Sequence, residues 1–161
     1  MGRVNLEIMR YQDRFDELLL KRYAAAINNR AADGITSGQV SAADLRTVIL
    51  DSGGRCAWCG ASLVDKDFEI DHLISLSAGG GNVGHNLVMT CPDCNRHKAG
   101  KHPARFASEL SAAGIKSPLV IRILAHYGLE PNHQRGLFDA PTPPAEQSNE
   151  DDTPPYRWHK G

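Results

Sequence analysis

The chain has 161 residues and a mass of 17.5 kDa, a length usual for one domain. Its 18 Lys and Arg residues against 19 Asp and Glu residues give a formal net charge of -1, which excludes a histone-like binder that relies on bulk positive charge. No stretch approaches the roughly 18 to 20 apolar residues that span a membrane, and the charged start lacks the apolar core of a secretory signal. We therefore expect a soluble, cytoplasmic protein.

Two helices are predicted before the first cysteine. Apolar residues recur at spacings of three and four between residues 6 and 29, namely Ile8, Tyr11, Phe15, Leu18, Leu19, Tyr23 and Ala26. The resulting amphipathic helix can pack on its own domain or on a protein partner. Ser41 and Asp44 form a capping-box pattern for a second, short helix, which Gly53 and Gly54 end.

All four cysteines lie in two C-x-x-C pairs with 31 residues between the pairs: Cys56, Cys59, Cys91 and Cys94. In a chain without a secretory signal, this arrangement favours a metal site over disulfides. Four soft thiolates suit a tetrahedral, structural Zn²⁺. Redox-active or incidental thiols are the alternative.

Between and after the cysteine pairs, the pattern predicts strands and helices in alternation with glycine-rich turns. Strands are expected near 68–74 and 87–89, on either side of a loop at 79–82, followed by a helix from 92 to about 100 that Gly100 ends. Pro103 and Ser117-Pro118 mark the starts of two further helices, which Gly114 and Gly128 end. Residues 139–161 hold five of the nine prolines and an acidic run, so a disordered tail is expected.

The segment between the cysteine pairs also carries a spaced set of polar residues. Asp71 precedes His72, Asn86 lies fourteen residues after His72, and Asn95 directly follows the last cysteine. Together with the glycine-rich loop and the C-x-x-C-N-x-x-K run that ends at Lys98, this pattern resembles the HNH endonuclease family over residues 54–100. Ser75 stands where the family often has proline, and Asn95 stands where other members have histidine.

The resemblance implies an α+β fold with a small ββα-metal (His-Me finger) core, a structural zinc, and flanking N- and C-terminal helices. The expected divisions are an N-terminal helical region at 1–53, the nuclease motif with its zinc site at 54–102, C-terminal helices at 103–137, and the tail at 138–161.

The expected activity is metal-dependent hydrolysis of phosphodiester bonds in DNA, although RNA stays open. His72 can take a proton from water near neutral pH, and Asp71 and Asn95 offer oxygen ligands to one catalytic Mg²⁺ or Mn²⁺. The family resemblance implies that Asn86 orients His72 through backbone hydrogen bonds. Because neighbouring strand residues point to opposite faces, Asp71 and His72 share a site only where the strand bends or ends.

Basic residues after Asn95 are candidates for substrate binding, in particular Arg96, Lys98 and Lys101. A solvated helix end, where cations are favoured by the helix dipole, is the alternative for this run. His97 lies two residues from Asn95 and therefore about 200° around a helix, so it is not expected to face the same ion.

Two other functions stay open: a non-catalytic zinc-stabilised DNA- or protein-binding module, and an interaction domain that docks through its N-terminal helix. A zinc module has no use for Asp71, His72, Asn86 and Asn95 at these spacings, so those four residues distinguish the nuclease from it. Lack of cleavage with any divalent ion would indicate the interaction domain.

Overall fold

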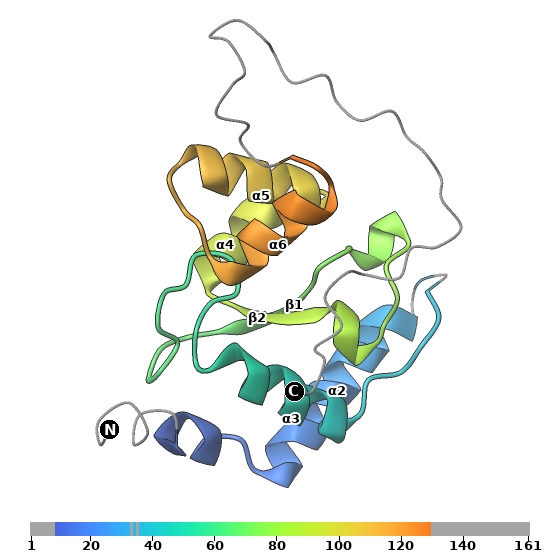
Figure 1. Cartoon of the computed structure of the whole chain (residues 1–161). Coiled ribbons are helices and arrows are strands. Elements are labelled where there is room, and N and C mark those ends of the chain that lie inside the picture. Colours follow the sequence, from blue (N-terminus) through green and yellow to red (C-terminus); the bar gives the residue numbers. More distant parts are fainter. Residues whose placement is uncertain (1–8, 33, 35, 130–161) are drawn as a thin grey trace, which may run out of the picture.

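The computed structural model describes residues 9–32, 34 and 36–129 (Figure 1). The expected tail at 138–161 lies outside these residues. The longer elements are α2 (Glu17–Ala32), α3 (Ala42–Ser52), β1 (Glu69–His72), β2 (Leu87–Thr90), α4 (Pro92–Lys98), α5 (Pro103–Ala112) and α6 (Pro118–His126). Within the described part of the chain, no helix has the length and apolar character needed to cross a membrane.

The centre of the fold is a two-stranded antiparallel sheet followed directly by α4. Glu69 pairs with Thr90 at one end of the ladder and His72 pairs with Leu87 at the other. Figure 1 shows α2 and α3 on one side of the sheet and α4, α5 and α6 on the other. The predicted α+β fold with a ββα unit is therefore confirmed.

One apolar core joins the ββα unit to the helices before and after it. Trp58, between the first two cysteines, is fully buried, and its ring meets that of Phe106 of α5 edge to face, with 4.9 Å between centroids. The Ser117 hydroxyl caps α6 and also donates to the carbonyl of Ala57 at 2.7 Å. The C-terminal helices are thus fixed directly against the turn that carries Cys56 and Cys59.

The continuous helix expected at 6–29 is wrong for its described part. Residues 9–13 are helical, the chain then leaves the helix, and α2 restarts at Glu17. Asp16 causes the restart, because its carboxylate accepts a 2.7 Å hydrogen bond from the Leu19 amide as a helix cap does. The new phase buries a different set of residues, which excludes the 69% exposed Leu18 and comprises Leu20, Ala24, Ile27 and Ala31.

The start of α3 follows the sequence prediction closely, whereas the end of α4 does not. Both hydrogen bonds of the Ser41–Asp44 capping box are present, and Gly53 takes the left-handed conformation after α3. In contrast, α4 ends at Lys98, and the residue with positive φ is Ala99 (φ 47°), not the expected Gly100.

Candidate active site and metal centre

The four cysteines come together from two separate turns. Cys56 and Cys59 lie in the turn enclosed by the Arg55–Ser62 bridge, while Cys91 caps α4 and Cys94 lies in its first turn. All four Sγ atoms lie within 4.8 Å of one another, and those of Cys59 and Cys91 are 3.9 Å apart. Ligands about 2.3 Å from a tetrahedral zinc are separated by similar distances. The cluster can therefore hold one zinc ion.

The electrostatics of the cluster also suit a dication. The pKa of Cys56 falls to about 4, mainly because the neighbouring Cys94 thiol donates a hydrogen bond to its thiolate. The hydrogen bond with Cys56, together with burial, in turn raises the pKa of Cys94. Without a cation, therefore, the thiolate form of Cys56 is stabilised only while Cys94 keeps its proton. A bound Zn²⁺ removes this conflict, since it stabilises thiolates at all four positions.

A second polar cluster forms where β1 faces α4. Glu69 and Asp71 are two residues apart on β1 and so project from the same face of the strand. Asn95 and Lys98 are three apart on α4, which places them on one face of that helix. The Asn95 amide nitrogen donates to the Glu69 carboxylate, so the amide oxygen of Asn95 is left for another partner.

Lys98 is the most buried member of this cluster. Its side chain is fully inaccessible, and its Nζ lies 2.8 Å from Oδ2 of Asp71 and donates to the backbone oxygen of His72 at 2.7 Å. The Lys98 ammonium, which the sequence predicted to bind substrate, therefore points into the protein. Burial raises the pKa of Asp71, and the nearby Lys98 opposes this rise.

The His72 ring contacts the glycine-rich loop. Its Nε2 lies 3.0 Å from the side-chain oxygen of Asn82, a residue that is itself fully buried. Burial lowers the pKa of His72, while the contact with Asn82 and the charge of Asp71 oppose the shift. β1 ends at His72, which is the condition under which Asp71 and His72 can serve one site, although the Asp71 carboxylate contacts Lys98 and the His72 ring contacts Asn82.

Asn86 holds the loop between the strands closed. Its side chain accepts from the Ile74 amide and donates to the carbonyls of Ile74 and Gly81, each at 2.9 Å. Its own carbonyl accepts from the Leu73 amide at 2.8 Å. These contacts fix the backbone just after His72, close to where the sequence predicted that Asn86 would act.

The comparison with protein families matches this region. Residues 56–111 match the model of a family described as HNH endonuclease. This segment is therefore similar to an HNH nuclease domain. No curated protein matches the chain. The match indicates, in general terms, nuclease activity on nucleic acid. The match contains both cysteine pairs, the glycine-rich loop, and the polar residues on β1 and α4.

The remaining basic candidates of this segment lie on its surface. Arg96 is exposed and pairs with Asp93, and Lys101 pairs with Glu109 at 2.6 Å. His97 is exposed on α4, away from the contact between Asn95 and Glu69. The positive charge expected after Asn95 is therefore partly offset by neighbouring carboxylates.

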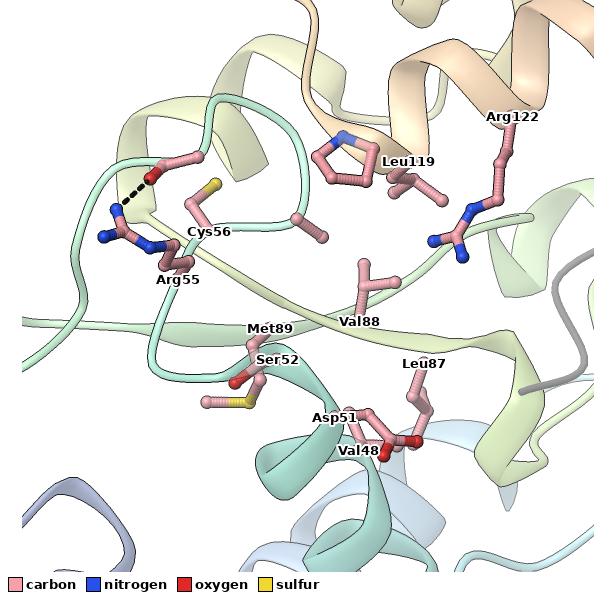
Figure 2. Close-up of a pocket in the computed structure, with 13 residues that line it drawn as sticks. Val48, Asp51, Ser52, Arg55, Cys56, Leu87, Val88, Met89, Leu119 and Arg122 are labelled. Atoms are coloured by element: carbon pink, nitrogen blue, oxygen red, sulfur yellow. Dashed lines mark hydrogen bonds between the residues drawn. The ribbon is translucent and has the colours of Figure 1, made fainter. Parts of the chain in front are cut away.

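An apolar pocket between α3, β2 and α6 lies away from these polar residues. Figure 2 shows Val48 of α3, Leu87 and Val88 of β2, and Leu119 and Arg122 of α6 around it. Asp71, His72 and Asn95 do not line this pocket. It is therefore separate from the candidate active site.

Three polar residues in these contacts were not predicted from the sequence. Glu69 could have been found, because it lies two residues before Asp71 and must share its strand face. Asn82 was noticed only as part of a loop, although its type and its place among glycines are typical of a residue that fixes a turn. Asn28 of α2, which contacts Asn82, carries no local signal at all.

Proposed function

We propose that the protein is a metal-dependent endonuclease that hydrolyses phosphodiester bonds in DNA, with His72 as general base and one catalytic divalent ion. The observation that carries this proposal is the contact between β1 and α4, where Asn95 bonds to Glu69 and Lys98 pairs with Asp71, inside the segment that matches the nuclease family. The oxygens of Asp71 and Asn95 are hard ligands of the kind that Mg²⁺ and Mn²⁺ prefer.

The donor set fits such an ion. Oδ2 of Asp71 is buried and paired with the Lys98 ammonium, 2.8 Å away, so the other oxygen of the Asp71 carboxylate would be the one to hold the ion. The amide oxygen of Asn95 is directed by the bond from its nitrogen to Glu69. Asp71 and Asn95 would hold the ion, which when bound stabilises negative charge on the phosphate and on the departing sugar oxygen.

The chain's own residues supply the proton chemistry and the binding. Since burial lowers the pKa of His72, its ring is neutral at pH 7 and can accept a proton from the attacking water. Asn86 fixes the backbone after His72 and so limits the movement of the base. Arg96 and Lys101 would contact the nucleic-acid backbone, whereas Lys98 would act from inside by holding Asp71 in place.

The test is cleavage by the purified protein of plasmid, linear and single-stranded DNA and of RNA, in Mg²⁺ or Mn²⁺. We expect nicking or cutting of DNA that stops with EDTA and resumes when excess Mg²⁺ is returned. Zinc content is measured in each sample, because EDTA can also remove a structural ion. His72→Ala should cut far more slowly than the wild type, and the exposed His97→Ala is its matched control.

One observation favours a second function, a non-catalytic zinc-stabilised module that binds DNA or protein. The Lys98 ammonium already compensates the Asp71 charge, as in a buried ion pair with a purely structural role. Retention of nucleic acid without cleavage in any divalent ion would support this function over the nuclease.

A further inference from the structure

Two side-chain amides, of the buried Asn82 and the partly buried Asn28, link His72 to the N-terminal helix. The side-chain oxygen of Asn82 lies 3.0 Å from Nε2 of His72, and the Asn82 side-chain nitrogen donates to Oδ1 of Asn28 at 2.8 Å. Asn28 belongs to α2, 54 residues before Asn82 and outside the segment that matches the HNH family. A residue outside the matched segment is thus connected to the candidate base.

The direction of each hydrogen bond follows from the backbone of Val40. The Val40 amide donates to Oδ1 of Asn28 at 2.8 Å, and the Val40 carbonyl accepts from Nδ2 of Asn28 at 2.9 Å. A backbone amide can only donate and a carbonyl can only accept, so the oxygen and nitrogen of Asn28 are fixed. Because Asn28 presents its oxygen to Asn82, Asn82 must turn its nitrogen to Asn28 and its oxygen to His72.

The same donor and acceptor rule determines which nitrogen of the His72 imidazole carries the proton. An amide oxygen can only accept, so the contact at 3.0 Å requires a proton on Nε2 of His72. In the neutral ring, Nδ1 is then the unprotonated nitrogen. Within the described part of the chain, Nδ1 makes no hydrogen bond and so is left for a water molecule.

We propose that Asn28 and Asn82 are positioning residues that hold His72 with Nε2 protonated and Nδ1 free to accept a proton. This inference rests on the proposed nuclease function for its catalytic meaning, but the tautomer can be observed without activity. It also gives the N-terminal helix α2 a role inside the catalytic unit, in place of the docking role considered from the sequence.

The cost of burial supports a specific role for these two amides. Asn82 is fully inaccessible, and a buried amide destabilises a fold unless each of its groups has a partner. The Asn82 oxygen contacts His72 and its nitrogen contacts Asn28, so both ends of the amide are used. An apolar residue would fill the same space without this requirement, but it would leave the imidazole free to rotate.

The first measurement is the tautomer of His72 in the full-length, zinc-containing protein. Nitrogen-15 NMR of histidine-labelled protein, well above the ordinary histidine pKa of about 6.5, distinguishes a protonated Nε2 from a protonated Nδ1. The His72 signals are assigned as those missing from His72→Gln. We expect the proton on Nε2, in slow exchange with water. A proton on Nδ1 would overturn the proposal, whatever the cleavage activity.

The second measurement removes the link to α2. In Asn28→Leu, we expect the slowly exchanging Nε2 proton signal to be lost. We also expect kcat for DNA cleavage to fall about 10- to 100-fold with little change in KM, the usual effect of losing a partner that orients a functional group. Asn28→Asp keeps both acceptor contacts, to Val40 and to Asn82, but places an oxygen against the Val40 carbonyl that Asn28 donates to. It should therefore be less stable, while the folded protein retains the Nε2 proton signal and most of kcat. The exposed neighbour Asn29→Leu is the matched control.

The outcomes separate this proposal from the proposed function. The expected tautomer in a protein that cuts no nucleic acid would leave the positioning of His72 intact and remove the nuclease. An active protein in which Asn28→Leu keeps both the Nε2 proton signal and kcat would overturn the role of α2. If Asn28→Leu fails to fold, Asn28→Asp and the wild-type tautomer still decide the question.

Discussion

The ammonium of Lys98 lies 2.8 Å from the Asp71 carboxylate, and the lysine side chain is fully inaccessible to solvent. Such a pair is costly to bury, and removing one partner leaves the other charge without compensation. The stability of the ββα unit therefore depends on Asp71, the residue expected to hold the catalytic ion.

Lys98→Met should lower the free energy of unfolding by about 3 to 5 kcal/mol, the usual effect of breaking a buried ion pair from one side. Added Mg²⁺ or Mn²⁺ should restore part of this loss, because a cation bound by Asp71 replaces the missing charge. Denaturant unfolding with and without the ion measures both effects. The exposed Lys116→Met is the control, and an equal loss of stability there would contradict the assignment.

Zinc should be present at one ion per chain and should stabilise more than the cysteine turns. Because Trp58 between Cys56 and Cys59 packs on Phe106, release of the metal should also loosen α5. Cys59→Ser is expected to lose zinc and to lower the melting temperature. Elemental analysis and thermal unfolding of protein purified without chelator test this. Absence of zinc from wild-type protein would remove the assignment.

Asn86 should be intolerant even of an isosteric change. Asn86→Ala loses three side-chain hydrogen bonds and should cost about 3 kcal/mol, at roughly 1 kcal/mol each. Asn86→Asp should cost at least as much, since it places an oxygen against the carbonyls of Ile74 and Gly81, which need a donor. Chemical denaturation compares the two. A stable Asn86→Asp protein would show that these carbonyls find other donors.

Local chemistry explains which parts of the fold the sequence predicted. The Ser41–Asp44 cap and the ββα order depend on neighbours in the chain, and both are present. The phase of α2 was mispredicted because one capping residue, Asp16, restarts the helix in a place where apolar spacing alone runs on.

In the candidate site, too, the contacts that depend on local spacing were predictable and those that depend on tertiary packing were not. The spacing that puts Asn95 and Lys98 on one helix face is local, but whether that face meets solvent or β1 depends on tertiary packing, so the burial of Lys98 could not be read from the sequence. The contact between Asn28 and Asn82 joins residues 54 apart, and no periodicity or motif relates them.

The role of His72 predicts a pH dependence with a definite sign. A protonated imidazole cannot accept a proton, so the cleavage rate should fall as pH drops through the His72 pKa. Burial lowers that pKa below the ordinary value of 6.5, and a divalent ion bound at Asp71 would disfavour the imidazolium further. The acid side of the rate profile should therefore lie below pH 6.5, and neutral pH should be on its plateau.

His72→Ala should cut about 10²- to 10⁴-fold more slowly, the usual contribution of a positioned general base, and should lose this acid side of the profile. Its zinc content should stay unchanged, since the His72 ring contacts Asn82 and none of the four cysteines. His97→Ala, which alters an exposed residue of α4, should keep the wild-type rate and profile. Asp71→Ala should differ from both, because part of its loss should be recovered at higher Mg²⁺ concentration. A folded, zinc-containing His72→Ala protein that cuts at the wild-type rate would exclude His72 as the base and leave the non-catalytic module as the better account of the chain.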